Sequence, residues 1–230
     1  MMNNFDNLVC KSCNGTCKLI ELFDTETAKT FNQSVVNVLY KKKETLIKQN
    51  SLTTHFFYIK SGLVKIFTER RNDKNILLQI VTPGNFLGIT HLLSNSFNYS
   101  AMAVQDAEVC IIPKIVILEA MQINEKLRNY LFFEQGKQSH FFIDKISSLG
   151  TKQMHGRLAD AILYLSREEF SGTKVFESIT RKDIAEMSGM SSESAIRLLT
   201  EFKNDGLIKS EGKKIEINNH ELIHRLSEIG

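Results

Sequence analysis

The sequence predicts an α+β protein in which an N-terminal β-roll (a jelly roll) precedes a long helix and a C-terminal winged helix-turn-helix. Three observations lead to this fold class. Short apolar runs separated by turn residues fill residues 34–113, which is typical of a jelly roll or barrel. A helical pattern without proline then covers residues 115–149. Finally, two amphipathic segments on either side of Gly189 are followed by a short alternating hairpin, as in a winged helix-turn-helix.

The β-roll is predicted strand by strand from its turns. Residues 56–60 and 63–67 flank Ser61-Gly62, which indicates a hairpin. Residues 19–30 suggest one short helix before the roll. The remaining strands are expected at residues 35–40, 76–81, 101–104 and 109–112, with turns at 41–44, 72–74 and 83–84.

The helical region at residues 115–149 is apolar on more than one side. A helix of this kind usually packs against a partner, so we expect a homodimer. The alternative is two helices that break near Gly136 and pack within one chain. The apolar side chains concerned are Leu118, Met121, Leu127, Tyr130, Leu131, Phe132, Phe133, Phe141, Phe142, Ile143 and Ile146.

Residues 191–202 are predicted to form the helix that enters the major groove of DNA. Ser191 is a favourable N-cap, and apolar residues recur at helical spacing on the side that would face a core. A shorter helix at residues 183–188, ended by Gly189, precedes it, and residues 207–217 predict a hairpin that would form the wing. Without the wing, an ordinary helical hairpin with a solvated polar face would explain the pattern equally well. The core positions are Ala195, Leu198, Leu199 and Phe202, and the outward positions are Ser192, Glu193, Ile196 and Arg197.

The net charge of the chain does not by itself indicate that the protein binds nucleic acid. The chain carries +3 overall, and residues 150–230 hold 12 Lys and Arg against 13 Asp and Glu. Affinity for phosphate must therefore come from cations placed locally. The candidates are Arg181, Lys182, Arg197, Lys203, Lys209, Lys213 and Lys214.

Three of the four cysteines lie close together near the N-terminus, at Cys10, Cys13 and Cys17, and Cys110 lies in an apolar stretch. Four cysteines match the ligand count of a cubane iron–sulfur cluster or a structural zinc site. A thiol redox switch would use the same residues, and Cys110 could simply be a core residue. A thiol oxidoreductase based on Cys10 and Cys13 is disfavoured, because the pair does not begin a helix that would lower a thiol pKa.

Composition excludes several further classes. The chain is 42% apolar and 24% charged, so it should bury a proper core. No run approaches the roughly 20 apolar residues of a membrane span, and no secretory leader is legible; we expect a cytoplasmic protein without membrane contact. No Ser-His-Asp or paired-carboxylate arrangement is legible, so we expect no enzyme. The predicted segments are 1–18 (cysteine-rich), 19–113 (β-roll), 114–149 (dimerisation helix) and 150–230 (winged helix-turn-helix).

Three motifs in this order resemble those of the Crp/Fnr superfamily. They are the sequences at residues 57–65 and 83–88 in the β-roll and at residues 183–199 in the helix-turn-helix. The resemblance implies a cyclic-nucleotide-binding-like β-roll and a homodimeric transcriptional regulator. It further implies a palindromic promoter site on double-stranded DNA and an interaction with RNA polymerase.

The resemblance also bears on the effector. The cyclic-AMP receptor branch holds its ligand with a glutamate and an Arg-Ser pair, where this chain has Ile89 and Tyr99-Ser100. A buried phosphate without a cation is costly, so cyclic AMP is not expected. A different small molecule in the β-roll, such as haem, stays open as an alternative.

The context of Cys110, residues 109–113, is similar to that in the oxygen-sensing fumarate–nitrate reduction regulator. This resemblance implies a [4Fe–4S] cluster that oxygen or nitric oxide destroys, although the gap between Cys13 and Cys17 is shorter than in that branch. A zinc or thiol switch is the alternative. The implied ligands of the metal and the cofactor are Cys10, Cys13, Cys17 and Cys110.

The family reads bases with a glutamate and an arginine four residues later, which are Glu193 and Arg197 here. Arg can pair with guanine, and Glu can accept from cytosine. Ile196 stands where relatives of the oxygen sensor have serine, so we expect a palindrome related to TTGAT–N4–ATCAA with a changed preference at that position. The predicted DNA-binding residues are Ser191, Ser192, Glu193, Ile196, Arg197, Arg181 and Lys213.

Overall fold

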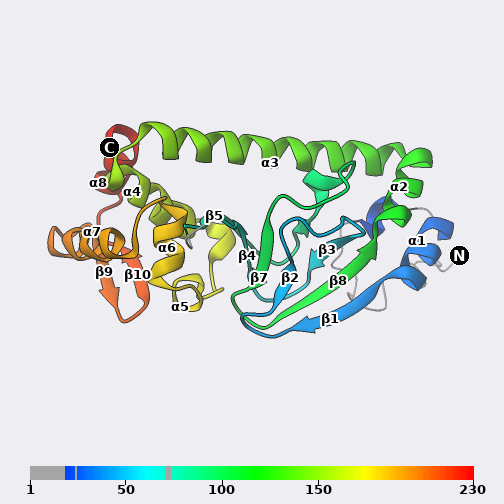
Figure 1. Ribbon diagram of the computed structural model, residues 1–230, viewed down its shortest axis with the longest axis horizontal. Coiled ribbons are helices and arrows are strands. Elements are labelled where there is room, and N and C mark those ends of the chain that lie inside the picture. Colours follow the sequence, from blue (N-terminus) through cyan, green and yellow to red (C-terminus); the bar gives the residue numbers. More distant parts are fainter. Residues whose placement is uncertain (1–18, 24, 71–73) are drawn as a thin grey trace, which may run out of the picture. The chain divides into compact units, whose positions relative to one another are not determined.

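The structure is a computed structural model, and it describes residues 19–23, 25–70 and 74–230 (Figure 1). The chain forms two compact units. The first comprises residues 1–64 and 81–140, and the second comprises residues 65–80 and 141–230. Among the described residues, no helix has both the length and the apolar character that crossing a bilayer requires.

The predicted β-roll is confirmed. Its strands form two four-stranded sheets, with the orders β1-β8-β3-β6 and β2-β7-β4-β5, and β8 pairs antiparallel with both β1 and β3. The elements of this part of the chain are η1 (Ile20–Leu22), α1 (Thr25–Ser34), β1 (Val36–Tyr40), β2 (Thr45–Ile47), β3 (His55–Ile59), β4 (Val64–Thr68), β5 (Ile76–Val81), β6 (Phe86–Leu87), η3 (Ile89–His91), β7 (Ser100–Ala103) and β8 (Ala107–Pro113).

Two local predictions in this part are wrong. The expected single helix at residues 19–30 is a 3-10 turn followed by α1. The expected hairpin around Ser61-Gly62 does not form, because β3 and β4 belong to different sheets. Gly62 serves a close backbone approach instead: its φ is +79°, and an added Cβ would lie 2.2 Å from the carbonyl oxygen of Asp106. The turn expected at residues 72–74 lies partly outside the described residues, and β2 and β6 were not predicted.

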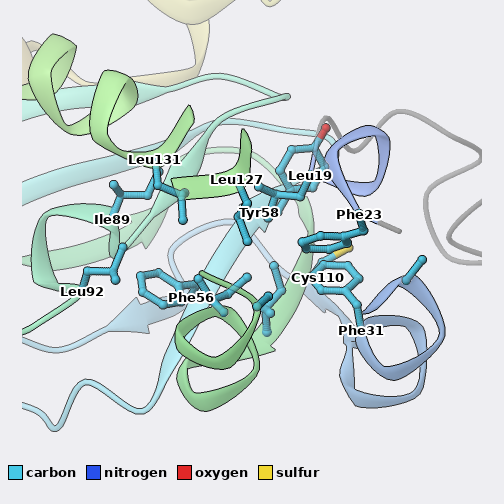
Figure 2. Close-up of a cluster of buried hydrophobic side chains, with 14 residues drawn as sticks. Leu19, Phe23, Phe31, Phe56, Tyr58, Ile89, Leu92, Cys110, Leu127 and Leu131 are labelled. Carbon is cyan, nitrogen blue, oxygen red and sulfur yellow. The ribbon is translucent and has the colours of Figure 1, made fainter. Parts of the chain in front are cut away.

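An apolar cluster joins the N-terminal helices to the roll (Figure 2). Leu19, Phe23 and Phe31 from the N-terminal segment lie beside Cys110 in β8, and Tyr58 in β3 belongs to the same cluster. Each of these side chains is less than 10% exposed. The segment that follows the predicted cysteine motif is therefore part of the core of the first unit.

The predicted helix at residues 115–149 is two helices, α2 (Lys114–Ile123) and α3 (Glu125–Thr151). The break falls at Asn124 and not near Gly136, which lies inside α3. The side chain of Asn124 causes the break, because its Oδ1 accepts the N–H of Leu127 at 3.0 Å and so caps α3. Its Nδ2 also donates to the carbonyl of Leu22 at 2.6 Å.

The second unit contains the predicted helix-turn-helix and wing. The first helix that lies wholly in this unit, α4, ends at Leu165, and α5 and α8 were not predicted. Gly156 permits the close packing of α4 on α8, since an added Cβ would lie 2.8 Å from the carbonyl oxygen of Gly230. The elements are α4 (Met154–Leu165), η4 (Glu168–Phe170), α5 (Val175–Ser178), α6 (Arg181–Met187), α7 (Ser192–Asn204), β9 (Ile208–Glu211), β10 (Lys214–Ile217) and α8 (His220–Ile229).

Candidate functional site

Side-chain caps fix both helices of the helix-turn-helix. Thr180 and Asp183 form a capping box at the start of α6, with the N–H of Thr180 donating to Asp183 Oδ2 at 2.7 Å. The turn bends at Gly189, whose φ is +59°, and an added Cβ would lie 2.8 Å from the side chain of Leu149. Ser191 then caps α7 by accepting the N–H of Ser194 at 3.1 Å. Side-chain caps and a glycine therefore define where α6 and α7 begin and where the chain turns between them.

The two faces of α7 have the chemistry that the sequence predicts. Ala195, Leu198, Leu199 and Phe202 are buried, whereas Glu193, Ile196 and Arg197 are exposed. Ile196 is 51% exposed, which leaves a large apolar side chain available for an apolar group such as a thymine methyl. Within the part of the chain that the structure describes, no hydrogen bond or ion pair engages the guanidinium of Arg197.

The carboxylate of Glu193 is suited to accept hydrogen bonds. Its own backbone N–H and the Ser191 side chain lower its pKa, so the group is ionised at neutral pH. An ionised carboxylate only accepts hydrogen bonds, which suits the amino group of cytosine. Ser192 lies beside it in the first turn of α7 and is partly exposed.

The wing is the antiparallel pair β9–β10, in which Glu211 faces Lys214 across the turn at Gly212. Arg181 braces this hairpin, because its guanidinium donates to the hydroxyl of Ser210 at 3.2 Å and to the carbonyl of Gly212 at 2.9 Å. Burial lowers the pKa of Arg181. The predicted contact of Arg181 with DNA stays a prediction, but the structure gives this residue a second task that the sequence did not indicate.

The remaining predicted cations differ in availability. Lys214 pairs with Glu216, and Lys182 lies 3.7 Å from Glu186, so both are partly neutralised. Lys213 at the tip of the wing is exposed, and no ion pair in the described ranges engages it. Lys213 is therefore a wing cation that is available to contact phosphate.

Lys65 is a residue of this region that sequence reasoning missed. Its ammonium lies 2.6 Å from Asp183 Oδ1, and both side chains are largely buried, with exposures of 16% and 7%. Burial alone would raise the pKa of Asp183, but the charge of Lys65 and the hydrogen bonds from Lys65 and Thr180 hold it below its usual value. Glu186, one turn later, is also buried, and burial raises its pKa. Lys65 thus supplies the cation for the acidic inner side of α6.

We expect Lys65→Met to destabilise the second unit by about 3–5 kcal/mol at neutral pH, because it leaves a buried carboxylate without its partner. In the wild type the depressed pKa of Asp183 contributes stability above the unfolded-state pKa, and this is lost as the pH falls through the folded-state pKa. The penalty of the variant should therefore shrink as the pH falls below about 4. Urea unfolding at several pH values measures both effects. Lys41→Met, which breaks the exposed pair with Asp106, should change stability little; an equal loss in both variants would contradict this account.

Of the predicted metal ligands, the structure describes only Cys110. This side chain is 2% exposed, lies next to Phe23 and Phe31 (Figure 2), and donates from Sγ to Asn37 Oδ1 at 3.0 Å. Cys10, Cys13 and Cys17 lie outside the described residues, and no three metal-ligating side chains come together among those described. Leu19, the first residue that the structure describes, belongs to the cluster of Cys110.

The β-roll positions that the family resemblance links to cyclic-nucleotide binding, Ile89 and Tyr99, are apolar or already engaged. Tyr99 is 3% exposed, and its hydroxyl accepts the N–H of Gly88 at 3.0 Å. Burial raises the pKa of Tyr99, so the hydroxyl is neutral. Ile89 is buried beside this turn. Neither position supplies the charge that a cyclic phosphate or its ribose would require.

Two family models match the chain. The family "Cyclic nucleotide-binding domain" matches residues 37–124, and "Crp-like helix-turn-helix domain" matches residues 156–226. Among curated relatives, the cAMP-activated global transcriptional regulator CRP of Salmonella typhimurium is 26% identical over 183 residues, which cover 77% of this chain and 87% of the relative. The transcriptional activator protein FnrA of Stutzerimonas stutzeri is 24% identical over 181 residues, which cover 77% and 74%.

Solved structures show the same fold. A regulator of the Crp/Fnr family from Eubacterium rectale has a TM-score of 0.76 at 20% identity and covers 93% of this chain and 99% of its own. FixK2 from Bradyrhizobium japonicum has a TM-score of 0.74 at 18% identity, with coverages of 84% and 96%. A β-roll followed by a winged helix-turn-helix, with both family models matched in that order, identifies this chain as a DNA-binding transcriptional regulator of the Crp/Fnr superfamily.

Proposed function

We propose that the chain acts in the cytoplasm as a homodimeric regulator that binds a palindromic DNA site through α7 and the wing. The observation that carries this proposal is the exposed face of α7, on which Glu193, Ile196 and Arg197 present an acceptor, an apolar group and a donor. These are the three kinds of contact that read base edges in the major groove. RNA polymerase is the partner expected of a regulator bound at a promoter.

The proposed dimer uses a stripe along α3. Phe132, Ile143 and Ile146 are 64%, 62% and 70% exposed. Together with Ser139 and Gly136 they follow spacings of three and four residues, which is the a/d pattern of a coiled coil. Leu127 and Leu131, by contrast, are buried within the chain. The helix therefore has an internal face and a second apolar face that a two-fold partner could cover.

Selection from random-sequence duplexes tests the DNA-binding proposal. We expect an inverted repeat whose half-sites lie about one helical turn, roughly 34 Å, apart. The base opposite Ile196 should depart from the TTGAT–N4–ATCAA pattern. Enrichment of a single asymmetric half-site would contradict the dimer, and no enrichment would contradict specific recognition.

We propose further that Cys10, Cys13, Cys17 and Cys110 hold a [4Fe–4S] cluster. Support comes from Cys110, which lies in an apolar cluster with Leu19 and Phe23, so that the chain from Leu19 onward packs beside the fourth thiol. When bound, such a cluster supplies a link that oxygen or nitric oxide destroys. The cysteines would tie residues 10–17 to β8, which ends where α2 begins. A zinc site or a thiol switch on the same cysteines is the competing proposal.

Anaerobic purification followed by iron and sulfide analysis separates these proposals. We expect about four irons and four sulfides per chain and a broad visible absorption band that bleaches in air. Cys110→Ser should lose the iron and the absorption while it remains folded. Stoichiometric zinc, or absence of metal from the anaerobic protein, would exclude the cluster and leave the DNA-binding proposal intact.

The four predicted segments, 1–18, 19–113, 114–149 and 150–230, remain part of this proposal as functional divisions for metal binding, sensing, dimerisation and DNA binding.

A further inference from the structure

A cavity of about 630 Å³ lies within the second unit, between the end of α3, α4 and α8. This volume falls in the range of small-molecule sites. Phe141 and Tyr164 provide an aromatic wall, with ring centroids 5.5 Å apart. Lys145, Arg167, His220 and His224 are among the polar side chains that line the cavity. None of the residues proposed to read DNA lines it.

The cavity holds more positive than negative charge. Lys145, Lys152 and Arg167 line it together with Asp144 and Asp160. Asp160 is fully engaged within the protein: it accepts from Lys152 at 2.9 Å and from the hydroxyls of Ser148 and Ser227. The negative charge of Asp160 is thus balanced by groups of the protein itself.

Lys145 has no comparable partner. Its ammonium donates to the backbone carbonyl of Met187, and no carboxylate of the described residues lies within ion-pair distance. Burial lowers the pKa of Lys145 to about 8, although the charge of Asp160 opposes the shift. Charges that proteins shield from water are normally paired. The ammonium of Lys145, which is partly buried, has no carboxylate partner among the described residues, and the cavity has room for a counter-anion.

The cavity is also separate from the proposed dimer stripe. Phe141, Lys145 and Ser148 are spaced by four and three residues and share one face of α3. At 100° per residue, Ile143 and Ile146 lie on the opposite face. A partner that covers the stripe therefore leaves this face of the helix unchanged.

We propose that the cavity is a binding site for a small organic oxyanion, either a phosphate ester or a carboxylate with a flat apolar body, whose charged group pairs with Lys145. The apolar body would lie along Phe141 and Tyr164. Arg167, which stands over the Tyr164 ring at 5.2 Å, and the exposed His220 and His224 would face the outer part of the ligand.

Isothermal titration of the full chain with two probes tests this site. Adenosine 5′-monophosphate represents phosphate esters and salicylate represents aromatic carboxylates. We expect saturable binding of at least one probe at concentrations up to about 1 mM, and its identity distinguishes the two sources. Lys145→Met should weaken that binding at least tenfold, since it removes the charge and keeps an apolar chain of similar length. Lys137→Met, on the same helix but paired with Glu134 outside the cavity, should bind as the wild type does.

Lys145→Gln provides a second variant that can still donate to Met187, in case the methionine variant does not fold. The affinity of the wild type should fall about tenfold per pH unit above 8 as the amine loses its proton. Asp144, Asp160, Lys152, Arg167, His220 and His224 face the same cavity and remain in Lys145→Met, so a pH dependence confined to the wild type belongs to Lys145. Absence of binding by both probes, or binding that persists in both Lys145 variants, would overturn the proposal.

Discussion

Arg197→Ala should abolish the discrimination between specific and unrelated DNA while leaving the fold intact. The side chain is exposed on α7, so its loss opens no cavity in the core. A bidentate arginine–guanine contact is worth about 1–3 kcal/mol, and a two-fold dimer makes the contact in both half-sites. The ratio of the dissociation constants for the selected palindrome and a scrambled duplex measures the loss.

Lys213→Ala is the matched control for this experiment. A phosphate contact carries no sequence information, so the variant should bind all duplexes more weakly by a similar factor. It should reduce the salt slope of binding by about 2, because the dimer loses one phosphate contact in each half-site. Arg197→Ala, in contrast, should change the ratio between duplexes. An unchanged ratio in Arg197→Ala would refute the assignment of α7 as the reading helix.

Ile146→Glu should convert the dimer to a monomer and lower the affinity for the palindrome by about two orders of magnitude or more. Ile146 is 70% exposed at the C-terminal end of the α3 stripe, and in a two-fold interface the substitution would bring two carboxylates together in an apolar seam. A monomer contacts only one half-site, so it loses much of the free energy with which the dimer binds the palindrome. Analytical ultracentrifugation and a DNA-binding titration measure the two effects.

Leu93→Glu serves as the control, because Leu93 is 90% exposed in the β-roll and lies off the stripe. It adds the same charge and should leave both oligomeric state and affinity unchanged. A monomeric Ile146→Glu variant that binds the palindrome as tightly as the wild type would contradict the proposed dimer.

The parts of the fold that sequence predicted are those with local causes. Ser191 and Gly189 mark the start of α7 and the turn before it by short-range capping and backbone geometry. Positions 195, 198, 199 and 202 are buried as their spacing predicts. The same local reading could have found α8, because Asn219 caps it in a recognisable way.

The parts that sequence missed depend on distant residues. Gly62 resembles a hairpin glycine until its close approach to Asp106 is known. Asn124 interrupts an apolar helical pattern, and one of its two hydrogen bonds reaches Leu22, far away in the chain. The pair between Lys65 and Asp183 joins residues 118 positions apart. Hydrophobic periodicity carries no information about contacts between distant residues. The sequence therefore did not indicate that Lys65 in β4 pairs with Asp183.

The attachment of β4 to α6 limits how this regulator can be divided. A fragment that contains only residues 141–230 keeps both helices of the helix-turn-helix and the wing, but it lacks Lys65 and so leaves Asp183 without its cation. The fragment also lacks Ile80. The backbone N–H of Ile80 donates to the hydroxyl of Tyr164, and its carbonyl accepts from the same hydroxyl. Residues 141–230, which contain the helix-turn-helix and the wing, therefore do not form a self-contained unit. Chimaeras with related regulators should exchange residues 65–80 together with the C-terminal part, so that Asp183 on α6 keeps Lys65 as its ion-pair partner.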